Sequence, residues 1–175
     1  LMAMIYSSYV TSLANLLPVA EADPGFVIVL PNIIADAELR IYRNLDLLDT
    51  SERDSSSTFT TGTRTFDLPT SIGTFIVCEE INVITPSSTT DPELGTRNQL
   101  VPCSNEMLNA LWPSSNGSTV PQYFSMFNQD TIIVGPFPDA AYTVEVVGTQ
   151  RPTPLSASNT STVLTNFFPD LFLAA

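Results

Sequence analysis

The chain has 175 residues, a length typical of one domain, and carries 18 acidic against six basic side chains for a formal net charge of −12. It contains no His, and all six basic residues are Arg, so His-dependent nucleophiles, His-ligated metals and lysine chemistry are excluded. An acidic chain without a basic run does not bind phosphate backbones tightly, and no apolar run approaches the length of a membrane span.

Two helices are predicted at the start of the chain. Apolar residues three and four positions apart predict the first over residues 1–17 and the second over residues 31–48. Pro31 suits the first turn of the second helix, because its missing N–H would have no helical partner there. Asp36 and Arg40 lie four positions apart on this helix and predict a weak, solvent-facing ion pair.

The pattern then changes from helical to strand-like. Residues 50–57 are polar and predict a loop, and residues 86–99 predict a second one. The β-branched and aromatic segments between and after them predict a hairpin at Gly62, strands over 75–85, 123–127, 131–135 and 142–149, and a short helix over 104–111 capped by Ser104. The last residues, 166–175, read as the first turns of a final helix.

This order of elements predicts an α+β fold: a helical bundle of two N-terminal helices and a C-terminal helix, with an inserted antiparallel β region. We expect an N-terminal helical part over 1–56, a β-rich region over 57–155 with a short helix near 104–111, and the start of the C-terminal helix over 156–175. Together they should make one compact domain. The chain starts at Leu1 rather than Met and stops on apolar residues, so we expect a fragment of a longer protein.

No catalytic residue, cofactor site or metal site is expected. Glu79 and Glu80 form the adjacent acidic pair of the sequence, but neighbours on a strand point to opposite faces and cannot converge as an acid–base pair. A carboxylate-dependent hydrolase at this pair is the one enzymatic alternative. Cys78 and Cys103 leave a disulfide and two free thiols both open.

Two stretches resemble the head-to-tail adaptor proteins of tailed phages. Residues 30–46, LPNIIADAELRIYRNLD, are similar to the family's helix with the pattern AE-x-R-I-x-R-x-L. The second stretch is similar to a region of the family that contains, in this order, a P-x-Y segment, a proline-rich turn, a Tyr, and an Arg that Leu-Ser follows after three residues. It is matched at Pro121–Tyr123, Gly135–Asp139, Tyr142, Arg151-Pro152 and Leu155. Residues 168–171 resemble the start of the family's closing helix.

The resemblance implies a structural protein of the virion rather than an enzyme. Copies would form a ring, twelvefold in most of the family, that docks beneath the portal and continues the DNA channel toward the tail. The implied partners are other copies of the chain, the portal protein and a tail or nozzle protein, with no membrane. The implied location is the neck of the virion, between capsid portal and tail, after synthesis in the host cytoplasm.

The family has no catalytic residues, so none are carried over. Glu38, Arg40 and Arg43 match its helix and become candidate intersubunit or portal contacts, with an intrachain salt bridge as the alternative for the two Arg. The acidic chain would meet passing DNA only through weak, repulsive contact. It departs from the family in having no Lys for docking. The alternative structural function is a capsid decoration or tail-tube module.

Overall fold

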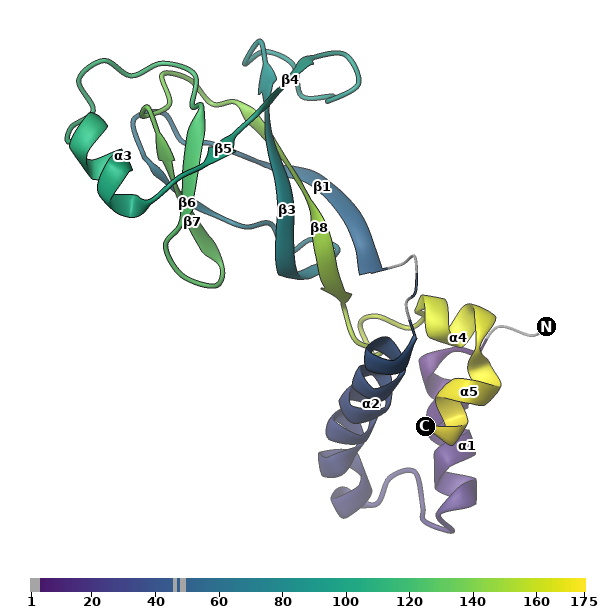
Figure 1. The fold of residues 1–175 in the computed structure, drawn as a ribbon. Helices are drawn as coiled ribbons and strands as arrows, with labels where there is room; N and C mark the ends of the chain where they lie inside the picture. The colour runs from purple at the N-terminus through teal and green to yellow at the C-terminus, as the bar shows by residue number, and fades with distance from the viewer. Residues whose placement is uncertain (1–3, 46, 48–49) are drawn as a thin grey trace. The chain divides into compact units, whose positions relative to one another are not determined.

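The computed structural model describes residues 4–45, 47 and 50–175, and it confirms the α+β class (Figure 1). The helices are α1 (Tyr6–Leu16), α2 (Pro24–Asn44), α3 (Asn105–Leu111), α4 (Val163–Phe167) and α5 (Pro169–Ala174). The strands are β1 (Ser51–Thr58), β2 (Thr65–Asp67), β3 (Gly73–Thr85), β4 (Thr96–Gln99), β5 (Val101–Pro102), β6 (Tyr123–Met126), β7 (Thr131–Gly135) and β8 (Thr143–Pro152).

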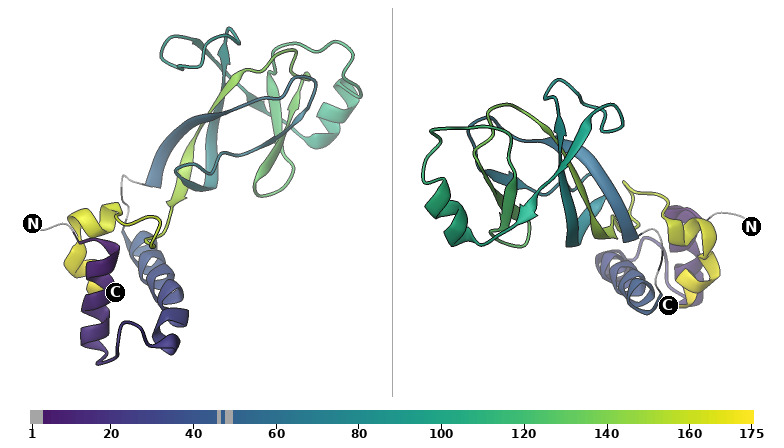
Figure 2. Two further views of the ribbon diagram at one scale, coloured as in Figure 1. Left: turned by 180° about the vertical axis from the view of Figure 1, so that it is seen from behind. Right: turned by 45° about the horizontal axis from the view of Figure 1, so that its top comes forward.

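The chain divides into two compact units. The helical unit comprises residues 1–50 and 152–175, and the β-rich unit comprises residues 51–151. Each unit has a hydrophobic core of its own. Figure 2 shows both units from two further directions. In the helical unit, α1, α2, α4 and α5 surround one core, so the unit is built from segments at both ends of the sequence.

The core of the helical unit joins α1 to α5 through an aromatic stack. The rings of Tyr9 and Phe172 lie 4.6 Å apart between centroids, with 17° between their planes. Leu13 from α1 and Ile34 from α2 pack into the same core, together with Leu164 from α4. All five side chains are buried, so this packing supplies the hydrophobic stabilisation that short helices lack by themselves.

The second helix starts earlier than the sequence predicts. It begins at Pro24, because the Asp23 side chain accepts a hydrogen bond from the Phe26 amide at 3.0 Å and caps the helix there. Pro31 therefore lies inside α2 rather than in its first turn. Its side chain is exposed, so the missing N–H falls on the solvent side, where water can satisfy the carbonyl that it leaves free. The helix ends at Asn44, four residues before the predicted end.

The final helix is two short helices rather than one. Thr162 caps α4 through a reciprocal pair of hydrogen bonds with Thr165, and Pro169 takes the first position of α5. The first helix is shorter than the predicted 1–17, and residues 1–3 of that prediction lie outside the described residues.

Two four-stranded sheets make up the β-rich unit. Their strand orders are β1-β8-β3-β4 and β2-β7-β6-β5. The pairs β1–β8, β3–β4, β2–β7 and β6–β7 are antiparallel, whereas β5 and β6 are parallel. Side chains from both sheets form one core, including Ile81 and Val83 of β3, Val144 of β8 and Val134 of β7. Helix α3 lies beside β6 and β7 (Figure 1).

Several strands and α3 confirm the sequence predictions, whereas β1, β4 and β5 were not predicted as strands. The hairpin predicted at Gly62 is wrong, because β1 pairs with β8 and β2 pairs with β7 in the other sheet. The predicted strand over 75–85 is β3, and α3 is capped by the Ser104 hydroxyl, which accepts from the Met107 amide at 3.2 Å. The predicted loop over 50–57 is wrong, because β1 occupies it and pairs with β8. The predicted loop over 86–99 contains β4 at its end. Both strands lie at sheet edges, where polar sequences are tolerated and mask the strand signal.

A polar cluster centred on the buried Glu145 crosses the first sheet and draws a side chain from each of its four strands. Glu145 of β8 is 1% exposed and accepts hydrogen bonds from Arg97 of β4, the shortest at 3.0 Å. Asn82 of β3 donates to it at 3.1 Å, and Arg53 of β1 lies 3.6 Å away. Arg97 also pairs with Glu93 at 2.6 Å. The hydrogen bonds that Arg97 donates to Glu145, and to a smaller extent the one to Glu93, raise the pKa of Arg97 above its usual value.

We expect Ile81→Ala to lower the free energy of unfolding by about 2–5 kcal/mol, because the side chain is fully buried and its loss leaves a cavity. Ile76→Ala on the same strand is the matched control. That side chain is 60% exposed, so the change should stay within about 0.5 kcal/mol. Urea unfolding of both variants measures the difference, and equal losses would contradict the assignment of Ile81 to the core.

We expect Arg97→Ala to lower the urea midpoint more than Arg53→Ala does. Arg97 donates hydrogen bonds to both carboxylate oxygens of the buried Glu145, whereas Arg53 makes one long contact at 3.6 Å. Removing the closer partner leaves the buried charge poorly compensated. Equal midpoints for the two variants would show that Glu145 does not depend on Arg97.

Candidate functional site

The three site residues expected from the sequence all lie on α2 but face different surroundings. Glu38 is 1% exposed and points into the helical unit, whereas Arg40 and Arg43 are exposed. A helix turns about 100° per residue, so positions two and five residues after a buried one leave the buried stripe. The structure therefore separates Glu38 from the two Arg.

Glu38 holds the chain segment that follows β8. Its carboxylate accepts a hydrogen bond from the Leu155 amide at 2.9 Å, with both groups buried. Burial raises the pKa of the Tyr9 hydroxyl, and the negative charge of Glu38 raises it further. This carboxylate thus connects α2 to residues more than a hundred positions later, inside the unit.

Arg40 does not form the ion pair predicted with Asp36. Its guanidinium instead donates to the Ala175 carbonyl oxygen at 2.9 Å, and Asp36 is exposed. Arg43 makes no ion pair or side-chain hydrogen bond with any residue that the structure describes. The intrachain salt bridge considered for the two Arg is thus not found within the described part of the chain.

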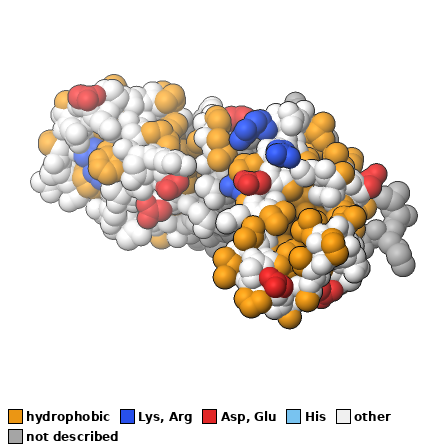
Figure 3. Space-filling view, turned by 90° about the horizontal axis from the view of Figure 1, so that it is seen from below, with side chains coloured by type: hydrophobic (Ala, Val, Ile, Leu, Met, Phe, Trp, Pro, Cys, Tyr) orange, Lys and Arg blue, Asp and Glu red, His pale blue; other side chains and the backbone are white. Residues whose placement is uncertain are grey.

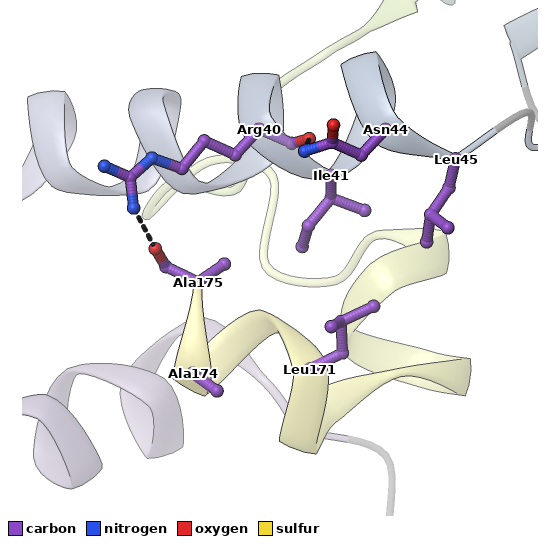
Figure 4. A pocket seen from close by; sticks show the side chains of 7 residues that line it. All are labelled: Arg40, Ile41, Asn44, Leu45, Leu171, Ala174 and Ala175. Carbon is purple, nitrogen blue, oxygen red and sulfur yellow. Dashed lines mark hydrogen bonds between the residues drawn. The ribbon is translucent and has the colours of Figure 1, made fainter.

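A groove with an apolar floor and a cationic rim lies between α2 and α5 (Figure 4). Its volume is about 400 Å³. Ile41 of α2 and Leu45, directly after α2, point into it, and Leu171 faces them from α5. Arg40 crosses its edge to reach Ala175. We call this surface the α2–α5 groove.

The opposite end of α2 carries an exposed apolar surface. We call it the apolar tip, and it consists of Leu16, Leu17, Val19, Val27, Ile28 and Val29. Ile28 is 75% exposed and Leu16 63%. Figure 3 shows hydrophobic side chains gathered over the helical unit on the face that it presents. Acidic Glu21 and Asp23 flank the tip, and no basic residue precedes Arg40 in the sequence.

The sequence reasoning did not find the apolar tip, although a signal was present. Residues 26–30, FVIVL, are apolar at every position, and a helix can bury only one face of such a run. Phe26 and Leu30 are buried in the unit, which leaves the three residues between them on the surface. Exposed apolar patches of this kind mark interaction sites.

The acidic pair and the two cysteines that the sequence singles out all lie in the β-rich unit. Glu79 is exposed and does not converge with Glu80, and Cys78 and Cys103 are free thiols. Burial, with a smaller contribution from the charge of Glu79, raises the pKa of Cys78 to about 11. Among the described residues no group of three or more His, Cys, Asp or Glu side chains could hold a metal ion. None of the described helices is long and apolar enough to cross a membrane.

Comparison with known proteins yields one family. The family model described as SU10 adaptor protein matches residues 4–175, nearly the whole chain. The match covers both units, including α2 with its two exposed Arg. No curated protein matches the chain.

We expect Glu38→Ala to lower the free energy of unfolding by about 1–3 kcal/mol, because the buried Leu155 amide loses its acceptor. Asp36→Ala, an exposed carboxylate on the same helix, is the control and should change stability by about 0.5 kcal/mol or less. Thermal and urea unfolding measure both. A loss in the control equal to that in Glu38→Ala would point to a general effect of charge on α2.

Proposed function

The chain belongs to the SU10 adaptor protein family, a family of phage head-to-tail adaptors and so of virion structural proteins, and from that premise we propose that it forms a ring beneath the portal. In this position the ring continues the DNA channel toward the tail, at the neck of the virion. The observation that carries the proposal is the family match over residues 4–175.

The charge distribution supports a passive conduit. The helical unit contains seven acidic and two basic residues, and the β-rich unit contains eleven acidic and four basic residues. Both units are therefore net negative. A channel lined by such units repels the phosphate backbone, so DNA slides through without sequence-dependent or tight binding.

The proposed partners are other copies of the chain, the portal protein and a tail or nozzle protein. We propose that the helices of the helical unit pack as one bundle. This unit offers two surfaces to the partners, the apolar tip and the α2–α5 groove. Arg40 and Arg43 are the exposed cations of this unit, and Glu38 fixes their helix from inside. The role is mechanical, without catalysis, and the ring is twelvefold as in most of the family.

Electron microscopy tests this proposal against the alternative of a capsid decoration or tail-tube module. We expect ring-shaped particles of the purified protein, and gold-labelled antibody to it at the neck of the phage particle. Label over the capsid shell or along the tail tube would overturn the proposal in favour of the alternative. A monomer in dilute solution would not, since rings can form on the portal.

A further inference from the structure

We propose that neighbouring copies of the chain contact each other by seating the apolar tip of one copy in the α2–α5 groove of the next. The inference rests on the proposed ring and names the surfaces that would build it. The occupant of the groove is a second copy, and the contact joins opposite ends of the same helix, α2.

The first argument is that both surfaces are apolar. The tip presents Ile28, which is 75% exposed, and Leu16, which is 63% exposed. The α2–α5 groove has a volume of about 400 Å³ and is lined by Leu45 and Leu171, which are each 39% exposed. Apolar side chains gain most when they leave water for a concave apolar surface.

The second argument is charge. With a net charge of −12, two copies repel each other unless cations of one face acidic groups of the other. In the helical unit the cations are Arg40 and Arg43, at the groove end of α2. At the tip end lie Glu21 and Asp23, with no basic residue. The groove side also carries Asp36 beside Arg40 and Asp170 directly before Leu171, so its charge is mixed. Contact between tip and groove lets Glu21 and Asp23 approach Arg40 and Arg43, whereas contact between two tips brings only acidic groups together.

The third argument is distance within one chain. From Ile28 to Leu45 the helix rises about 25 Å at roughly 1.5 Å per residue, so tip and groove of one copy cannot meet. When the tip of one copy engages one neighbour and its groove engages another, the contact runs head to tail, and such contacts close into a ring when the rotation allows. A symmetric dimer that joined tip to tip would leave the grooves of both copies uncovered.

Cysteine cross-linking between full-length chains tests the contact. We expect a mixture of Ile28→Cys and Leu45→Cys chains to form a disulfide dimer under mild oxidation, and neither variant to do so alone. The unmodified chain is the control. Its thiols react slowly near neutral pH, because burial raises the pKa of both Cys78 and Cys103.

A dimer of Ile28→Cys alone would show a symmetric tip-to-tip contact and overturn the proposal. No dimer in the mixture, under conditions in which the unmodified chain assembles, would overturn it as well. If antibody labelling places the chain at the neck of the phage but the mixture of cysteine variants does not cross-link, this contact is refuted and the proposed function stands. A chain absent from the neck refutes the proposed function whatever the cross-link.

Ile28→Asp gives a second readout. We expect self-association to weaken by about tenfold or more, because a side chain that the contact buries becomes charged. Leu94→Asp is the matched control: Leu94 is 81% exposed but lies in the β-rich unit, so association should not change. Sedimentation measures association, and circular dichroism verifies that both variants fold. Equal weakening by both variants would overturn the proposal.

Charge reversal tests the register of the contact. Glu21→Arg alone and Arg43→Glu alone should each weaken association, because each places like charges across the contact. The chain with both changes should associate more strongly than either single variant. If the double variant associates no more strongly than the single variants, the proposed pairing of tip and groove charges is overturned.

Discussion

The core of the helical unit is assembled from both ends of the chain, and the position of every surface on that unit depends on this packing. Tyr9 and Phe172 stack at 4.6 Å although 163 residues separate them in sequence. The Glu38 carboxylate adds a buried hydrogen bond to Leu155, which returns the chain from β8 to the helices. Without α4 and α5, the apolar stripes of α1 and α2 would lack much of the core that covers them. The entropy of closing so long a loop has to be overcome before these contacts form.

The scarcity of cations is a second constraint on the molecule. Arg97 and Arg53 compensate the buried Glu145 within one sheet, and Arg64 lies 5.2 Å from the ring centroid of Phe137. Arg40 reaches the Ala175 carbonyl at the rim of the groove. These four Arg side chains make contacts within the chain, and the net charge is −12. The few cations that stay exposed, Arg40 among them, therefore have a large influence on how copies of the chain can approach one another.

Elements with strong local signals were predictable, and elements that depend on pairing were not. The alternation in β3 and the Ser104 cap of α3 can be recognised in the sequence, and both are observed. The polar sequence SERDSSST predicts a loop, but this segment is β1, because pairing with β8 stabilises it as a strand. Pro31 predicts the start of α2, because a proline favours the first turn, but the Asp23 cap begins the helix earlier.

The sequence by itself determined the chemistry that this protein lacks, the α+β class and the helix that carries Glu38, Arg40 and Arg43. Only the tertiary structure decided that Glu38 is buried while the two Arg are exposed, and that an apolar tip and a groove lie at opposite ends of α2. The physical reason is that helical periodicity fixes which side chains share a face. Which face is covered depends on partners such as α5, which come from the far end of the chain.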